Sequence, residues 1–191
     1  MREVKRLKIW KIENEVDYYK GFSLKNEKDI DLLKNNFDKG QPIKEWMPLS
    51  LKPSDDNKGV GDCPQFWSYS NLLMVSKRAK DIISRGFRGF IEFLPVEDTV
   101  NNDTYYLANI LNQLDEIDYD KSEFRKLMDI YIVEVTKYVF KDNARNIPIF
   151  KIYLDGVLMT TDMYVNDEFK NLIEDSELEG FKFTEVFDFE A

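Results

Sequence analysis

Histidine is absent from all 191 residues of the sequence. Imidazole is the side chain that most often serves as a general base near neutral pH, and it is a common ligand of zinc. Its absence therefore excludes Ser-His-Asp and Cys-His catalysis together with every His-ligated zinc site. An enzyme with this sequence would have to work with carboxylates, lysine, tyrosine or a metal held by other side chains.

Cysteine is almost absent as well, because Cys63 is the only one in the chain. A single thiol can form neither an intrachain disulfide nor a Cys-x-x-Cys metal site, and it suits a reducing compartment. Unpaired cysteines are among the residues most often buried in protein interiors. We therefore predict that Cys63 is a small buried hydrophobic residue rather than a reactive nucleophile.

Long runs without charge are missing. The longest one, residues 63–76, is too short to span a bilayer and contains Pro64 and several polar residues. Charges also interrupt every apolar run in MREVKRLKIWKIENE, so the start of the sequence lacks the apolar segment of a signal peptide. These features predict a soluble, cytoplasmic protein without a membrane partner.

Positive charge is outnumbered, since 27 Lys and Arg stand against 36 Asp and Glu and give a net charge of −9 at pH 7. Nucleic acids and anionic lipids both need clustered Lys and Arg for binding, so neither is expected as a partner. A basic protein is favoured, because opposite fields speed encounter. The alternative is that the negative charge only keeps the protein in solution.

Apolar side chains are plentiful, at 43% of the sequence with 14% aromatic, and this excludes a disordered chain. The length suits one domain of ordinary size. We predict a single domain over residues 1–191, with lobes 1–110 and 111–191 sharing a core as the other organisation.

Apolar periodicity predicts more strands than helices. Strands are expected over 6–13, 48–52, 72–75, 90–96, 104–110, 130–141, 147–154, 163–165 and 181–189. Helices are expected over 26–37, 77–85 and 167–175, and irregular chain over 52–62 and 114–124. Residues 90–96 and 104–110 should form a hairpin, with Pro95 marking the end of a strand or a sheet edge. The pattern predicts an α+β fold with a mostly antiparallel sheet and few helices.

Part of the sequence is written twice, 90 positions apart: VSKRAKDII begins at Val75 and VNDEFKNLI at Val165, followed by IEFLPV at position 91 and FKFTEV at position 181. Each copy predicts a strand–helix–strand unit, with Ser76 or Asn166 as the N-cap of the helix. Identical residues recur at five positions, namely Val75, Lys80, Ile83, Phe93 and Val96 of the first copy. Either the fold contains a duplicated unit, or capped amphipathic helices between strands simply look alike.

The best candidate for chemistry is an acidic cluster formed by Asp115, Glu116, Asp118, Asp120 and Glu123. Paired carboxylates can hydrolyse glycosidic bonds, but only where they converge in a cleft. An EF-hand starting at Asp118 is rejected, because its sixth position holds Glu123 instead of Gly and its twelfth holds Asp129 instead of Glu. A solvated acidic face is the simpler interpretation. The GVG triplet at 59–61 lacks the surrounding pattern of a phosphate-binding loop.

Three tryptophans, Trp10, Trp46 and Trp67, are candidates for a binding platform, since tryptophan is enriched at interface hot spots. Each is also at home in a core, and the core is the interpretation we favour for all three.

The order of motifs carries a resemblance to a known family. A KIW strand is followed by GQPIKEW at 40–46, GDCP at 61–64, VSKRAKDII, IEFLPV, YYLANILNQLD, KSEF, YVFK, IFKI and the closing YVNDEFKNLIEDSELEGFKFTEV. This order resembles the immunity-protein family eleven of bacterial polymorphic toxin systems, over nearly the whole chain. No single motif is catalytic, so the resemblance depends on the order of the motifs.

The resemblance implies a cytoplasmic antidote that binds a cognate toxin domain and blocks it without catalysis. It supplies no catalytic, cofactor-binding or metal-binding residues. We predict that the toxin-facing surface includes two polar, aperiodic stretches, the loop 52–62 and the segment 114–123. The candidate contact residues are Asp55, Asp56, Asp115, Glu116, Asp118, Tyr119 and Asp120. The alternatives are a carboxylate-based hydrolase or small-ligand-binding domain, and a regulatory binding module with no toxin.

Overall fold

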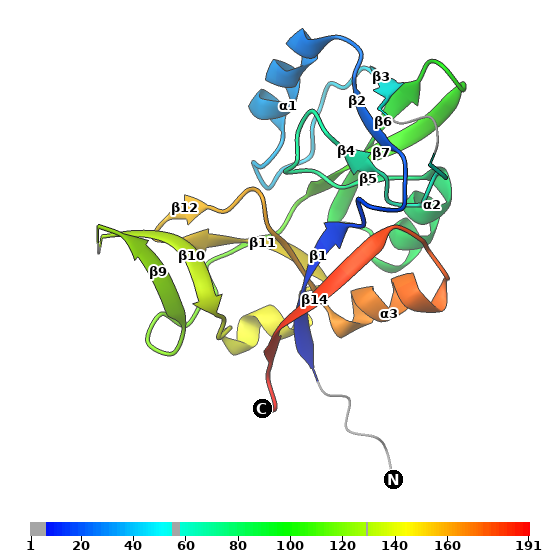
Figure 1. Ribbon diagram of the computed structural model, residues 1–191. Helices are drawn as coiled ribbons and strands as arrows, with labels where there is room; N and C mark the ends of the chain where they lie inside the picture. Colours follow the sequence, from blue (N-terminus) through cyan, green and yellow to red (C-terminus); the bar gives the residue numbers. More distant parts are fainter. Residues whose placement is uncertain (1–6, 55–57, 129) are drawn as a thin grey trace.

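The fold contains two large sheets, one small sheet and a few short helices (Figure 1). The computed structural model describes residues 7–54, 58–128 and 130–191. Most strand pairs are antiparallel, and the predicted α+β class is confirmed.

The elements have the following bounds. The β1 sheet contains, in spatial order, β12 (Val157–Leu158), β11 (Ile149–Leu154), β13 (Met163–Asn166), β1 (Lys8–Asn14) and β14 (Phe181–Asp188), with β8 (Gln113–Leu114) beside β11. The β7 sheet contains β4 (Gln65–Phe66), β2 (Gly21–Leu24), β3 (Leu49–Pro53), β6 (Ile91–Asp98), β7 (Asp103–Ile110) and β5 (Met74–Val75). The small sheet pairs β9 (Glu123–Leu127) with β10 (Tyr131–Lys137). The helices are η1 (Glu27–Asp29), α1 (Ile30–Asn36), α2 (Lys77–Gly86), η2 (Asp142–Asn146) and α3 (Asp167–Asp175).

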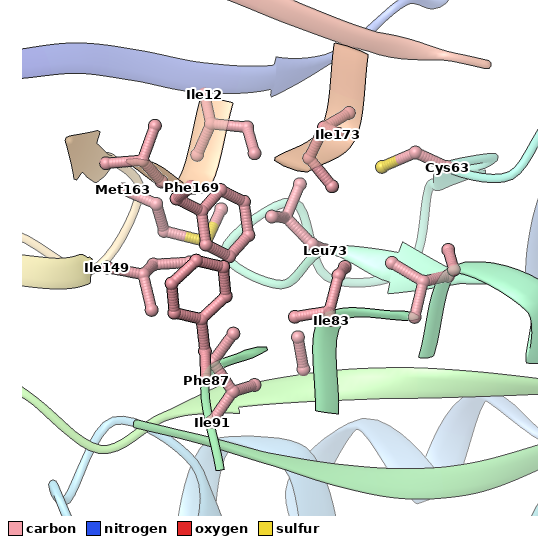
Figure 2. Packing of buried hydrophobic residues seen from close by; sticks show 14 of the residues in the cluster. Ile12, Cys63, Leu73, Ile83, Phe87, Ile91, Ile149, Met163, Phe169 and Ile173 are labelled. Atoms are coloured by element: carbon pink, nitrogen blue, oxygen red, sulfur yellow. The ribbon is translucent and has the colours of Figure 1, made fainter. Parts of the chain in front are cut away.

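Three clusters of buried apolar side chains lie on the faces of these sheets. The α1 core joins one face of the β7 sheet to α1 and contains Phe22, Leu24, Leu33, Phe37, Leu49, Leu51, Phe66, Leu72, Met74, Leu94, Val96, Tyr105 and Leu107. The central core joins α2 and α3 to both sheets and contains Ile12, Cys63, Leu73, Val75, Ala79, Ile83, Phe87, Ile91, Ala108, Ile110, Ile149, Met163, Val165, Phe169, Ile173 and Leu178 (Figure 2). The arm core contains Ile9, Ile117, Val135, Phe140, Ala144, Phe150, Ile152, Leu154 and Tyr164.

Because side chains alternate along a strand, each large sheet contributes residues to two of the cores. Successive side chains of a strand point to opposite faces. In β1, Ile9 belongs to the arm core, whereas Ile12 belongs to the central core and Trp10 packs against it. Ile9 therefore faces away from Trp10 and Ile12.

Both copies of the sequence repeat form the same structural unit. Ser76 Oγ accepts a hydrogen bond from the N–H of Ala79, and Asn166 Oδ1 accepts one from the N–H of Phe169, each at 3.1 Å. Both predicted N-caps are therefore confirmed. In each copy the strands before and after the helix flank one antiparallel strand, which is β7 in the first copy and β1 in the second. Each copy is thus a strand–helix–strand unit whose two strands are separated in the sheet by a third strand.

The register of the two units matches as well. Tyr106 of β7 pairs with Val75 on one side and with Pro95 on the other. Trp10 of β1 makes the matching pairs. Its partner in β13 lies 90 positions after Val75, and its partner in β14 lies 90 positions after Pro95. In the first unit the middle strand, β7, follows the helix along the chain, whereas in the second unit the middle strand, β1, comes from the beginning of the chain. The two middle strands are therefore not related by the 90-residue offset, and only the strand pairing shows that they are equivalent.

The lysine shared by both copies has the same contact in each. Lys80 Nζ lies 5.4 Å from the ring centroid of Tyr106, and Lys170 Nζ lies 4.7 Å from that of Trp10. Both distances are within the range of cation–π attraction. In both units the ammonium of the repeated lysine therefore lies over an aromatic ring of the middle strand.

Some predicted elements need correction. The helix expected over 26–37 is a 3-10 turn, η1, followed by α1, and the side chain of Asn26 caps η1 by accepting from the N–H of Lys28 at 3.3 Å. Pro95 does not end its strand, because β6 continues to Asp98, but pairing with β3 starts only one residue later and leaves Pro95 at a local edge. Periodicity does not predict β2, β4, β8, β9, β12 or η2, which are all five residues long or shorter, and β9 begins within the segment 114–124 that is expected to be irregular.

Segments far apart in sequence are joined in the β1 sheet, where β1 pairs with both β13 and β14. The single domain over 1–191, with lobes 1–110 and 111–191 as the other organisation, stays a prediction.

Candidate partner-binding surface

The acidic segment, residues 114–123, runs alongside the chain that follows β10. Ile117 is fully buried and forms an isolated β-bridge with Phe140. Next to it, the N–H of Asp118 donates to the carbonyl of Val139 at 2.8 Å. The segment is therefore fixed to the body of the protein, although it lacks regular structure between β8 and β9.

Two of the predicted contact residues are held by neighbours within the molecule. Asp118 accepts a hydrogen bond from the N–H of Asp120 at 3.2 Å and pairs with Lys121 Nζ at 3.0 Å. The hydrogen bond from Lys121 lowers the pKa of Asp118. Glu116 Oε1 accepts a hydrogen bond from Asn143 Nδ2 at 3.2 Å. These two carboxylates stabilise the local chain, so substituting them would change more than the surface.

The other predicted residues of the segment face solvent. Asp115 and Asp120 are exposed and make no ion pair within the described ranges. Tyr119 stacks on Phe124 of β9 with ring centroids 5.5 Å apart, and its hydroxyl accepts from the N–H of Asp155 at 2.9 Å. Tyr119 thereby links the segment to β9 and to the turn between β11 and β12.

The loop 52–62 lies elsewhere. Asp55 and Asp56 fall outside the described residues. β3, which leads into the loop, lies at the opposite end of the view from β9 and β10 (Figure 1). At the far end of the loop, Asp62 is buried and accepts hydrogen bonds from Ser76 Oγ at 2.6 Å and from an arginine of α2 at 3.0 Å. The structure therefore does not bring the described part of this loop next to the acidic segment.

A surface that the sequence analysis missed is the β9–β10 hairpin, which we call the arm (residues 123–128 and 130–137). Its exposed side carries three cross-strand pairs, which are Glu123–Lys137, Arg125–Glu134 and Leu127–Tyr131. The two charged pairs are ion pairs, with nitrogen–oxygen distances of 3.5 and 2.7 Å. The charges of these two pairs therefore compensate each other.

Apolar side chains gather at the end of the arm. The apolar tip consists of Leu127, Met128, Ile130, Tyr131 and Val133, which are 57%, 79%, 67%, 64% and 40% exposed. Single exposed apolar residues are ordinary on a protein surface, whereas a contiguous group of them marks an interaction site. The run IYIVEV reads as a core strand in sequence, and only the positions of its neighbours show that one of its sides is left exposed by the described residues.

The root of the arm is anchored. Val135 belongs to the arm core, and Phe124 and Ile132 pack against it. An isolated two-stranded hairpin is only marginally stable in water. The apolar contacts at the root therefore hold the arm in place while its tip stays exposed.

The tryptophans are divided between core and surface. Trp10 and Trp46 are partly buried against the central core and the α1 core, in line with the favoured interpretation. For Trp67 that interpretation is wrong, because its side chain is 54% exposed and its Nε1 donates to Ser54 Oγ at 3.0 Å. Its role as a binding platform stays a prediction.

Cys63 is fully buried, as predicted, and burial raises the pKa of its thiol. Asn14 Nδ2 donates to its sulfur at 3.1 Å. Within the described part of the chain, no group of three or more acidic or cysteine side chains is placed to hold a metal ion. Cavities of about 680 and about 550 Å³ are lined by other segments, the first by Leu32 and Met47 and the second by Tyr138 and Phe187.

The arm and the acidic segment have the character of a protein-binding surface, with apolar contact area beside uncompensated acids. The model of the Imm11 immunity protein family matches residues 11–188 of the chain. The chain therefore belongs to the Imm11 immunity protein family, and the resemblance seen in its motifs is confirmed. Immunity proteins have a toxin as their partner in general and are generally not enzymes.

No curated protein matches the chain significantly. None of the helices in the described ranges combines the length and the apolar character that crossing a membrane requires.

Proposed function

We propose that this protein is a cytoplasmic immunity protein that binds the toxin domain of a cognate bacterial toxin and blocks it by occlusion, without catalysis. The observation that carries the proposal is the match of the Imm11 immunity protein family over residues 11–188. A chain without histidine that exposes an apolar tip is better equipped to cover a protein surface than to carry out acid–base chemistry.

The charge of the chain favours a basic toxin. A net charge of −9 creates a field that attracts a cationic partner and speeds its capture. A stable inhibitory complex typically buries about 1,600 Å² in total, or about 800 Å² on each partner, which calls for a surface of about 20–30 residues. Both regions are therefore expected to belong to one interface, linked through Tyr119.

Co-expression tests the proposal directly. A toxin domain encoded by the neighbouring reading frame should stop growth when expressed alone, and co-expression of this chain should restore growth. The two proteins should also co-purify as a stable complex. Failure of both rescue and co-purification would contradict the proposal, as would toxin-free turnover that disappears when a single carboxylate is neutralised.

The exposed acids of the segment should contribute to binding. We expect Asp115→Lys with Asp120→Lys to weaken toxin binding about tenfold at low salt and less at high salt, because screening already weakens the native attraction there. Asp118 is left intact, because it stabilises the turn. Binding is measured by calorimetry at two salt concentrations.

The matched control is Asp17→Lys with Glu45→Lys. These acids are also exposed, and the variant has the same net charge as the first one. If both variants weaken binding equally, the long-range field matters and the acidic segment is not part of the interface. Unchanged affinity of the Asp115 and Asp120 variant would likewise remove the segment from the interface.

A further inference from the structure

We propose that the arm is the element that enters the toxin, and that its receiving site is an apolar cleft with basic residues at the rim. The inference rests on the proposed function and adds to it the contact element and the chemistry of the partner site. It makes the complex depend mainly on a few apolar side chains of the tip, with the acids beside the arm as a secondary contribution.

The first argument is the concentration of exposed apolar surface. Large apolar side chains that are exposed elsewhere in the described chain occur singly, as at Val100, or in small numbers, as at Leu32 and Met47 beside one cavity. The tip, in contrast, places five of them within seven consecutive positions, 127–133. Water contact with such a group is unfavourable, and covering it stabilises a complex. A tip of this kind fits a concave apolar site, because a flat surface would cover only one side of it.

The second argument is the charge along the shaft. Arg125 pairs with Glu134 at 2.7 Å, and Glu123 pairs with Lys137 at 3.5 Å. A partner that encloses the tip therefore meets no uncompensated charge on these two rungs. A paired charge costs less to bury than an unpaired one, so the two ion pairs lower the cost of enclosing this side of the arm.

The third argument concerns the rim of the cleft and separates a toxin from a second copy of this chain. Asp115, Asp120 and Asp155 are exposed near Tyr119, and none makes an ion pair with a described residue. A symmetric contact between two arms would bring these acids close to their own copies, and like charges facing each other weaken binding. A cleft rimmed by Lys and Arg would instead be attracted to them.

The fourth argument is preorganisation. The root of the arm is packed into the arm core through Val135, Phe124 and Ile132, and Tyr119 adds a ring contact to Phe124 at 5.5 Å. A contact element that is already ordered loses less conformational entropy when it binds. The tip is therefore suited to tight binding even though its own area is small.

The experiment compares tip variants with variants at matched exposed positions. The toxin domain encoded by the neighbouring reading frame, in a catalytically inactivated form, is the probe. Leu127→Ser with Tyr131→Ser should weaken its binding at least about 100-fold, mainly through faster dissociation, because truncating apolar hot spots acts on the off-rate. The control, Met47→Ser with Val100→Ser, removes side chains that are 81% and 68% exposed and should change affinity less than about threefold.

A second tip variant covers the case in which the double substitution disturbs folding. Met128→Asp changes one residue that is 79% exposed and has φ of +52°, a conformation that Asp tolerates better than most side chains. It should keep the melting temperature of the native protein and still weaken binding at least about tenfold.

The outcomes separate the inference from the proposed function. If the native protein binds the toxin and the folded tip variants bind it equally well, the arm is not the contact element, and the inference is overturned while the function stands. If the native protein does not bind the toxin at all, both fail. If the native protein forms a dimer that the tip variants dissolve, with no loss of toxin affinity, the tip serves self-association and the inference is overturned.

Discussion

Lys151→Ala is expected to lower the free energy of unfolding by about 3–5 kcal/mol, which is the usual cost of leaving a buried charge without its partner. For a chain of this size the melting temperature should fall by about 6–20 °C, since each kcal/mol corresponds to about 2–4 °C. Thermal and urea unfolding followed by circular dichroism measure both quantities. A change this large from a single lysine requires that the side chain be fully enclosed and fully bonded.

The surroundings of Lys151 meet that requirement. Its side chain is 1% exposed and lies on β11, yet its ammonium forms an ion pair with Asp38, which follows α1. It also donates to the carbonyls of Asn71 at 3.0 Å and Thr160 at 2.6 Å. All three donors of the ammonium are therefore used, and they connect a strand of the β1 sheet to two segments that adjoin the β7 sheet. Alanine would leave a cavity, a partly buried carboxylate and two unpaired carbonyls.

Two controls isolate the cause. Lys182→Ala removes an exposed lysine of β14 and should change stability by less than about 0.5 kcal/mol. The double variant Lys151→Met with Asp38→Asn removes both charges and keeps most of the volume, so it should be considerably more stable than Lys151→Ala. If Lys151→Ala unfolds like the native protein, this ion pair does not hold the two sheets together.

The pH dependence of the same site has a definite sign. Burial lowers the pKa of Lys151 below its ordinary value of 10.5, and Asp38 opposes this shift. Below the folded-state pKa the lysine is charged in both states, and the cost of burying the charge is fully present. Between the folded-state pKa and 10.5 the unfolded chain binds more protons, so the contribution of Lys151 to stability rises with pH. The unfolding free energy of the native protein should therefore increase relative to that of Lys151→Met in the alkaline range.

Local features were predictable from the sequence, and pairings between distant segments were not. The caps at Ser76 and Asn166 and the apolar faces of α2 and α3 depend on residues within one or two turns, so periodicity predicts them. The insertion of β1 between β13 and β14 brings together segments more than 140 residues apart, and nothing in the spacing of either segment specifies the partner. The third strand that separates the two strands of each repeat is therefore seen only in the structure.

The candidate site divides in the same way. Its acids are visible in the sequence, but composition does not distinguish Asp118, which is used within its own turn, from Asp115, which faces solvent. The apolar tip is invisible for a different reason. Residues such as Ile130 and Tyr131 favour strands wherever they occur, and whether a strand is covered depends on packing partners that come from elsewhere in the chain. The same limit applies to Lys151, whose burial depends on Asp38.

Phe169→Ala should also lower the free energy of unfolding by about 3–5 kcal/mol, the typical cost of deleting a buried aromatic ring from a core. Phe169 is 1% exposed on α3, and its ring stacks on Phe87 with centroids 5.0 Å apart. Figure 2 shows both rings next to Ile149 and Met163, where the second repeat meets the chain that follows the helix of the first. The cavity would thus form at the contact between the two repeats. Filling it would require residues of both repeats to move.

The functional readout of this substitution differs from that of the tip variants. Phe169 lies in the central core and the arm packs on the arm core, so the fraction of Phe169→Ala that is folded should bind toxin with native affinity. Protection in cells should nevertheless decline as temperature rises, because a loss of this size lowers the amount of folded protein. Phe169→Leu, which keeps most of the volume, should lose clearly less stability and keep protection at the higher temperature. Weaker toxin binding by fully folded Phe169→Ala would show that the central core and the binding surface are coupled, contrary to the separation of cores described above.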